Sequence, residues 1–427
     1  MIKAPRSIQG LKRFWWTLMI FLAIIAVVII ISNSSKKQAK DSPIQIAFNK
    51  LSEKSGILPD LGFFPVCPDN LDGILTAQLM DPQYISGLIP LGNINPPGHT
   101  SPVDHIYFDT VYEGKIPLYA PADAWITHVT EILYQDDTGN YISSDFGLTY
   151  TLCKGLVLDL AGYTGISSRL REKLDEVRSE CVYGINKIGH DKVEGQCHYN
   201  VTIPVVSGEE LGYTQAEMKD NRLTLPLEVW AANYNVPARA DVNWDFYNDD
   251  RYAHIMCLFD LYSGDLKDQY YQKFGYYDTK HKKEQANQEP EFIARTIEPR
   301  CGQVNQDLTG TIQGMWYAGK PGERNLESQG KGLAFLHNNI DPTMAEISIG
   351  GTIMDPLAVL FQPRHSGFVD REPSEVTADG NIYCFNTRDD KGKVLVQLMD
   401  DHHMKVENQD GACTDLEEFN IAYDYMR

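Results

Sequence analysis

Short runs in which apolar and polar residues alternate dominate the chain from about Tyr84 onward. They include "YISGLIPLG", "HIYFDTVY", "IPLYAPADAWITHVTEILY", "FGLTYTLC", "GLVLDLAGY", "VTIPVVSGEELGYT" and "RLTLPLEVW", and after residue 295 "GTIQGMWYAG", "KGLAFLHNN", "AEISIGGTI", "GNIYCFNT" and "KVLVQLMDD". A period of two is typical of strands with one buried face, and glycine and proline mark the turns between them. The pattern therefore predicts a mainly β protein.

Two stretches break this period. In "GISSRLREKLDEVRSEC", Leu170, Leu174 and Val177 are spaced by four and three residues, and Ser167 precedes them as an N-cap. This pattern predicts a surface helix that Cys181 could attach to the sheet. A second helix is expected around Leu266 to Phe274.

The N-terminus has a different pattern. Residues 14 to 32, "FWWTLMIFLAIIAVVIIIS", carry no charge, and Lys3, Arg6, Lys12 and Arg13 precede them. About 20 apolar residues span a bilayer as a helix, and basic residues favour the cytoplasmic side. A cleaved signal peptide is the alternative, but no A-x-A-like site follows. We therefore expect a single-pass membrane protein with a cytoplasmic N-terminus and the bulk of the chain extracytoplasmic.

Charge and cysteine content agree with that location. The formal net charge of -20 argues against nucleic acid as a partner, since a nucleic-acid-binding face must be basic. The eight cysteines are even in number, scattered and without a C-x-x-C pair. Such cysteines indicate disulfides in an oxidising compartment, with Cys384–Cys413 as one expected bridge.

Five segments follow from these patterns. We predict a cytoplasmic tip and transmembrane anchor (1–32), a stalk and loop region (33–83), a β domain (84–232), a connector with a short helix (233–294) and a C-terminal small antiparallel β-barrel or sandwich (295–427).

Candidate chemistry gathers in "NINPPGHTSPVDHIYFDTVY", residues 93 to 112. His105 and Asp109 are four residues apart, so an extended chain places both on one face. Asp104 is expected to face the other way, and His99 to bond within the proline turn. The carboxylates Glu113, Glu131 and Glu228 are scattered, so no acid–base pair is predicted.

Residues 87 to 230 resemble the lysostaphin-type zinc endopeptidases, which are built on a duplicated hybrid β motif. The family's H-x-x-x-D element is matched by "HIYFD", and "G-x-P-V-x-A-P-x-D-G-x-V" by "GKIPLYAPADAWITHV". Its glycine-flanked strand pair is matched by "FGLTYTLCKGLVLDLAGYTGIS", and "V-x-x-G-x-x-I-G" by "IPVVSGEELGYT". The closing "H-x-H-F-E-V" is matched by "TLPLEVW".

The resemblance implies that His105 and Asp109 stand at two of three zinc-ligand positions. The closing histidines are replaced by Thr224 and Pro226, and the assisting histidine by Gly162. Catalytic zinc needs three protein ligands, so we expect no cofactor, no catalytic residue and a degenerate, pseudopeptidase-like domain. Such a domain would bind, scaffold or regulate a cell-envelope component.

Two alternatives stay open. His99 or His128 could complete a zinc site, which would make the chain an active metallohydrolase with rearranged ligands. The second alternative rests on "GMWY" at 314–317, which resembles the G-x-W-Y start of lipocalin barrels. That resemblance implies a carrier of a small apolar ligand, with Trp316 closing one end of the barrel.

Overall fold

The computed structural model describes residues 64–96, 98–110, 112–135, 141–183, 193–219, 222–240, 242, 250–278, 291–319, 328–387, 392–414 and 416–427. All of them belong to one compact unit, residues 64–427. The expected membrane anchor and residues 33–63 of the expected stalk and loop region lie outside the described residues. Residues 64–83 of that region are described, and their Leu75, Leu79 and Met80 are buried in the core of the first sheet. Within these residues, no helix is long and apolar enough to cross a membrane.

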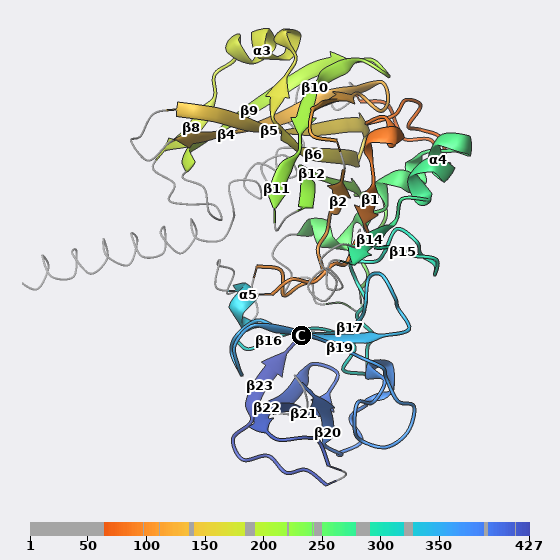
Figure 1. The fold of residues 1–427 in the computed structure, drawn as a ribbon, viewed down its shortest axis with the longest axis vertical. Coiled ribbons are helices and arrows are strands. Elements are labelled where there is room, and N and C mark those ends of the chain that lie inside the picture. Colours follow the sequence, from red (N-terminus) through yellow and green to blue (C-terminus); the bar gives the residue numbers. More distant parts are fainter. Residues whose placement is uncertain are drawn as a thin grey trace, which may run out of the picture. The chain divides into compact units, whose positions relative to one another are not determined.

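The fold is mainly β, as predicted. The first sheet is antiparallel, in the order β1-β2-β12-β6-β5-β4-β9-β8, and β11 and β13 also pair with β12 (Figure 1). Its strands are β1 (Gly87–Ile89), β2 (Ile106–Asp109), β4 (Ala124–Gln135), β5 (Tyr141–Cys153), β6 (Leu156–Tyr163), β8 (Glu180–Tyr183), β9 (Val193–Val205), β11 (Glu217–Lys219), β12 (Arg222–Asn233) and β13 (Ile255–Met256).

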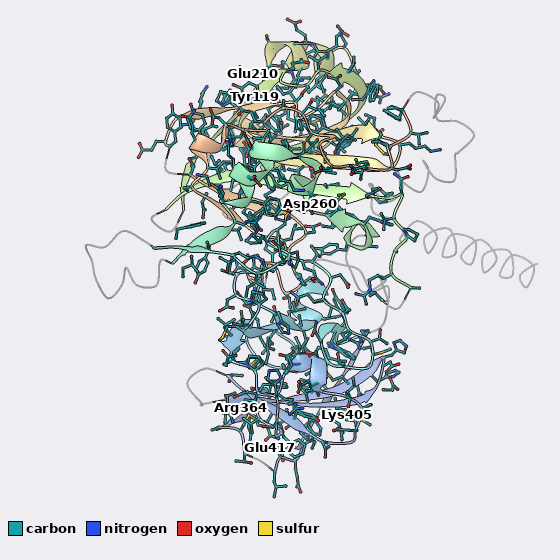
Figure 2. All side chains as sticks on the ribbon, turned by 90° about the vertical axis from the view of Figure 1, so that its right-hand side faces the viewer. Tyr119, Glu210, Asp260, Arg364, Lys405 and Glu417 are labelled. Atoms are coloured by element: carbon teal, nitrogen blue, oxygen red, sulfur yellow. A yellow bond between two sulfur atoms is a disulfide. The ribbon has the colours of Figure 1, made fainter. Side chains whose placement is uncertain are left out.

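Smaller elements flank this sheet. They are the three-stranded sheet β3 (Lys115–Tyr119), β10 (Glu210–Gln215) and β7 (Gly165–Ile166), the pair β14 (Gly275–Asp278) and β15 (Glu291–Ala294), and the short 3-10 helices η1 (Pro82–Tyr84), η3 (Asp250–Ala253) and η4 (Leu258–Leu261). Tyr119 and Glu210 are partners in the β3–β10 register, and both are labelled in Figure 2.

The two predicted helices are present. The first, α3 (Ser168–Asp175), begins after Ser167, whose hydroxyl accepts from the backbone N–H of Leu170. Leu170 and Leu174 are buried, whereas Val177 lies beyond the end of the helix and is exposed. The second, α4 (Gly264–Tyr271), buries Tyr270 and Tyr271. The sequence pattern therefore located both helices.

Burial alternates along the central strands of the first sheet. In β12, Leu225, Leu227 and Val229 are buried, while the residues between them are part-exposed. The core extends beyond the sheet, because residues from Cys257 to Val304 pack into it, among them Leu258, Phe259, Leu261, Tyr262 and Phe274. Part of the expected connector is thus built onto the first sheet.

The second sheet is antiparallel, in the order β19-β18-β17-β16-β23-β22-β21-β20. Its elements are β16 (Gly314–Tyr317), α5 (Ser328–Lys331), β17 (Gly332–His337), β18 (Ala345–Ile349), β19 (Leu357–Phe361), η6 (Pro373–Glu375), β20 (Tyr383–Asn386), β21 (Gly392–Asp400), β22 (His403–Asp410) and β23 (Tyr423–Met426). The first strand, β16, thus pairs with the last, β23. The core of the sheet holds the fully buried Trp316, Phe335, Phe385 and Tyr425.

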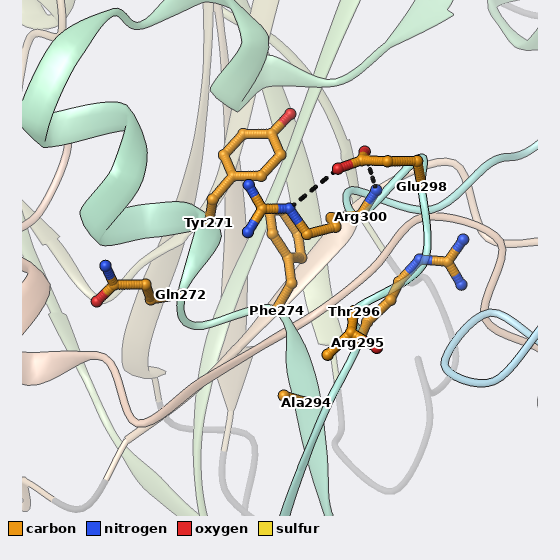
Figure 3. Close-up of a pocket in the computed structure, with 8 residues that line it drawn as sticks. All are labelled: Tyr271, Gln272, Phe274, Ala294, Arg295, Thr296, Glu298 and Arg300. Carbon is orange, nitrogen blue, oxygen red and sulfur yellow. Dashed lines mark hydrogen bonds and ion pairs between the residues drawn. The ribbon is translucent and has the colours of Figure 1, made fainter.

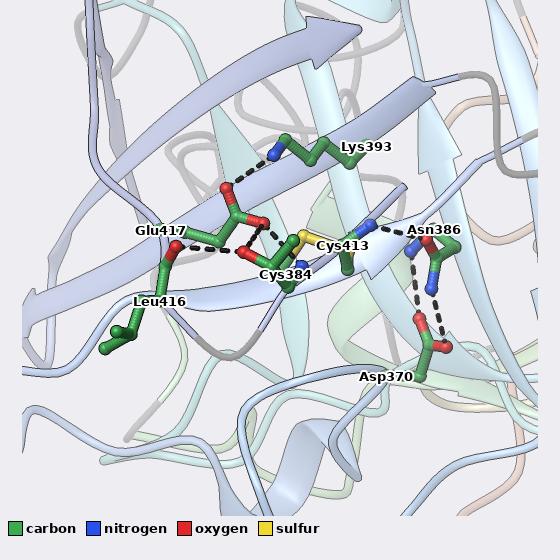
Figure 4. The surroundings of a disulfide bond; sticks show 8 residues. Asp370, Cys384, Asn386, Lys393, Cys413, Leu416 and Glu417 are labelled. Atoms are coloured by element: carbon green, nitrogen blue, oxygen red, sulfur yellow. Dashed lines mark hydrogen bonds and ion pairs between the residues drawn. A yellow bond between two sulfur atoms is a disulfide. The ribbon is translucent and has the colours of Figure 1, made fainter. Parts of the chain in front are cut away.

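Four disulfides join all eight cysteines: Cys67–Cys153, Cys181–Cys197, Cys257–Cys301 and Cys384–Cys413. The predicted Cys384–Cys413 bridge is confirmed. It fixes the segment after β22, where Lys393 and Glu417 form a buried ion pair and Asn386 accepts from the Cys413 N–H (Figure 4). Cys181 joins β8 to β9 and does not attach α3 directly.

Candidate functional site

His105 stands at the entrance to β2, between two carboxylates. Its Nδ1 lies 2.8 Å from Oδ1 of Asp104, and its Nε2 lies 3.5 Å from Oε2 of Glu228 on β12. The expectation that Asp104 faces away from His105 is wrong, because both residues precede β2 and the chain is bent there, so strand alternation does not apply. The ring is therefore oriented by acidic groups on both sides.

Asp104 carries the buried charge of this cluster. It is 3% exposed and forms an ion pair with Arg251, whose Nη2 lies 2.8 Å from Oδ2. Burial alone would raise the pKa of Asp104, but the hydrogen bond with His105 and the positive charge of Arg251 outweigh burial and lower it. Asp104 is therefore a carboxylate at neutral pH. Arg251 also lies over the ring of Trp230, 4.6 Å from its centroid.

Aromatic rings complete the cluster. Tyr107, on β2, meets His105 edge-on at 4.6 Å, and its hydroxyl lies 3.3 Å from Nε2 of His99. Burial and the nearby charges of Glu228 and Asp104 raise the pKa of Tyr107, so its hydroxyl stays protonated.

The positions matched to the closing histidines lie on β12, the strand that pairs with β2. Thr224 is the direct register partner of Asp109 across β2 and β12, and the register then shifts before Glu228. Pro226 occupies this irregular stretch. A Cβ on Gly162, which has a φ of +94°, would lie 1.9 Å from the Pro226 carbonyl oxygen, so only glycine fits there.

His105 and Asp109, the two predicted zinc ligands, have few other potential metal ligands near them. Asp109 is 5% exposed and ends β2, the strand that His105 enters. Within the described ranges, no three His, Cys, Asp or Glu side chains are grouped so that they could hold a metal ion. The His99 ring is near, with its centroid 6.0 Å from that of His105.

His128 cannot serve as a third ligand beside His105. It lies on β4, four strands from β2, which at about 4.8 Å per strand is roughly 19 Å away. Its Nε2 instead lies 3.2 Å from Nδ1 of His198, and its Nδ1 lies 3.1 Å from Oδ1 of Asn200. Burial and the nearby His128 lower the pKa of His198.

A polar row connects the two histidine groups across the sheet. Cross-strand partners place Trp230 beside Asp159, Asp159 beside Thr149, and Thr149 beside His128. The Thr149 hydroxyl donates to Asp159 at 2.6 Å, while burial raises the pKa of Asp159. The next row contains Ala161 opposite Gly147, so the middle of the face carries little side-chain bulk. We call residues 105, 107, 228, 230, 159, 149 and 128 the polar face.

Sequence reasoning missed several of these residues. Alternation in "LPLEVW" could have placed Glu228 and Trp230 on one face, and the resemblance matches Glu228 to the family's glutamate. Arg251 lies in η3, within the expected connector, and no sequence signal links it to Asp104.

A comparison with family models, curated proteins and solved structures finds no match to the chain. The geometry of the polar face is therefore the basis for inferring a function. The polar face offers hydrogen-bond donors, hydrogen-bond acceptors and an aromatic ring on a sheet. Such groups bind polar ligands noncovalently, without a chemical reaction.

Proposed function

We propose that this chain is a membrane-anchored, extracytoplasmic protein whose first sheet is a catalytically degenerate lysostaphin-type domain that binds a cell-envelope component. Pairing between the matched segments supports this proposal. The "HIYFD" strand β2 pairs with the "TLPLEVW" strand β12, and β12 pairs with the glycine-flanked strand β6. The "KIPLY" strand β3 pairs with the "ELGYT" strand β10 in the smaller sheet.

One observation carries the proposal of a binding role. Thr224 stands opposite Asp109 and Pro226 comes two positions later, where the resemblance requires imidazoles, and His105 is already engaged by Asp104 and Glu228. Zinc hydrolysis needs three protein ligands around an open position. The side chains that remain are suited to recognition.

The disulfides support the proposed location. Four disulfides in one chain are typical of proteins in oxidising compartments. The net charge of -20 disfavours nucleic acid as a partner.

The second sheet pairs its first strand, β16, with its last, β23, as lipocalin barrels do, but in the described residues its edge strands β19 and β20 do not pair, so the sheet is a half-barrel. Arg427 covers the Trp316 ring at 4.4 Å, and Trp316 Nε1 donates to the Ile312 carbonyl at 2.8 Å. The core of the second sheet is filled by large side chains, which favours a packed supporting domain over a carrier of an apolar ligand. Apolar ligand found by mass spectrometry in the purified protein would favour the carrier.

The test uses the full-length protein in detergent with purified peptidoglycan sacculi. We expect co-sedimentation without release of soluble fragments, and at least a tenfold weaker apparent affinity for Trp230→Ala, because the part-exposed ring and the Arg251 stack are lost together. Tyr423→Ala, an exposed aromatic on β23, is the matched control and should bind as wild type.

Two results would overturn the proposal. Absence of co-sedimentation would remove the envelope-binding role. Stoichiometric zinc together with fragment release, both lost in His105→Ala, would establish the metallohydrolase alternative.

A further inference from the structure

A pocket of about 290 Å³ lies where the end of α4, the start of β14 and the segment after β15 meet. It is lined by Tyr271, Gln272, Phe274, Ala294, Arg295, Thr296, Glu298 and Arg300 (Figure 3). None of these residues belongs to the polar face. A ligand of this pocket is therefore independent of the proposed function.

Arg295 is the unusual member of this pocket. Only 5% of it is exposed, its Nε donates to the Pro299 carbonyl at 2.8 Å, and its Nη1 donates to the Asn339 carbonyl at 2.7 Å. Among the residues that the structure describes, no carboxylate lies within ion-pair distance of it, and Nη2 makes no hydrogen bond. Burial lowers the pKa of Arg295, which reflects the cost of a desolvated cation.

The neighbouring carboxylate, Glu298, acts on this cation only at a distance, because its ion-pair partner is Arg300. Glu298 is engaged with Arg300, with Oε1 lying 3.2 Å from Nε, and their side chains are 75% and 37% exposed. An ion pair so exposed is weak and easily rearranged. The pocket therefore carries a net positive charge, contributed by the buried guanidinium.

The opposite wall is aromatic. Tyr271 and Phe274 meet edge to face, with ring centroids 5.5 Å apart, and the Arg300 guanidinium lies 4.8 Å from the Tyr271 centroid. Figure 3 shows Arg300 beside these rings, with Ala294 at the end of β15 and Arg295 directly after it, and the Arg295 guanidinium extends away from the rings. A pocket that has both an apolar wall and a cation in its lining is suited to a ligand with an apolar body and a small anionic group.

We propose that this pocket binds a small organic carboxylate. Its carboxylate would accept from Arg295 Nη2, and its apolar body would lie against Tyr271 and Phe274. A guanidinium donates to carboxylate oxygens in a planar fork, which makes a carboxylate a better fit than a spherical anion.

Isothermal titration of the full-length protein with benzoate tests this proposal, with neutral benzamide as the isosteric control. We expect benzoate to bind at least tenfold more tightly than benzamide, because only the anion forms a charge-assisted hydrogen bond. Ala294→Trp, which fills the pocket from an exposed strand position, should abolish binding. Glu298→Gln should strengthen binding several-fold by removing the competing negative charge.

Arg295→Gln should weaken benzoate binding at least tenfold, but Arg295 also holds two backbone carbonyls, so this variant could misfold. Ala294→Trp and Glu298→Gln test the proposal without changing Arg295. Equal affinity for benzoate and benzamide, benzoate binding unchanged by Ala294→Trp, or no binding up to about 20 mM would each overturn the proposal.

Discussion

His337 is held by an acceptor at each ring nitrogen. Nε2 lies 2.9 Å from the buried Glu372 carboxylate, and Nδ1 lies 2.6 Å from the Pro342 carbonyl oxygen. The hydrogen bond to Glu372 raises the pKa of His337 despite partial burial. Burial alone would raise the pKa of Glu372, but its hydrogen bond with His337 lowers it.

These shifts predict a pH window for stability. The contribution of His337 is complete below its unfolded pKa of about 6.5 and is lost as pH rises through the raised folded pKa. The contribution of Glu372 is complete above its unfolded pKa, near 4.3, and is lost as pH falls through the lowered folded pKa. Between about pH 6 and pH 9, wild type should lose about 1–2 kcal/mol of unfolding free energy that His337→Gln does not lose.

Urea denaturation at several pH values measures this difference. His403→Gln is the matched control, because His403 pairs with Asp400 in a turn where both side chains are more than half exposed. Its pH profile should follow that of wild type. Parallel profiles for wild type and His337→Gln would contradict the assignment.

At the scale of elements, α3 shows how far local sequence determines structure. Ser167→Ala removes the hydroxyl that accepts from the Leu170 N–H and should destabilise the protein by about 1 kcal/mol. Ser168→Ala, at the exposed first residue of the helix, should cost much less. Thermal unfolding compares the two, and equal effects would mean that the cap contributes nothing.

The strands and helices could be predicted from periodicity because each of them buries one face. The spacing of apolar residues within the element itself shows which face that is. The candidate site did not follow, because its contacts join residues far apart in the chain. Asp104 and its ion-pair partner Arg251 are separated by about 147 positions in the sequence. His105 contacts Glu228 on β12, a strand far from β2 in the sequence that pairs with it in the folded protein. The bend before β2 also reversed the expected direction of Asp104, since alternation holds only within a regular strand.

At the scale of the whole molecule, one side chain links the segment before β16, the first strand of the second sheet, to the end of β23, its last strand. Arg427 donates to the carbonyls of Gln313, Leu308, Thr311 and Asp401 and covers the Trp316 ring. The pairing of β16 with β23 thus depends on the contacts that the Arg427 side chain makes next to these two strands.

Arg427→Met keeps the apolar length but leaves these carbonyls without their donor. We expect a loss of about 2–3 kcal/mol in unfolding free energy and a changed near-ultraviolet signal from Trp316. Arg364→Met, at an exposed position labelled in Figure 2, is the control and should change neither. A wild-type unfolding midpoint for Arg427→Met would refute this role.

The Cys257–Cys301 bridge encloses α4, β14 and β15. A protease that cuts once anywhere between the two cysteines therefore leaves two polypeptides that stay covalently attached. On a gel without reductant such a nicked molecule would migrate as if intact, and only thiol treatment would separate its pieces. Integrity of this protein is thus judged properly only after reduction.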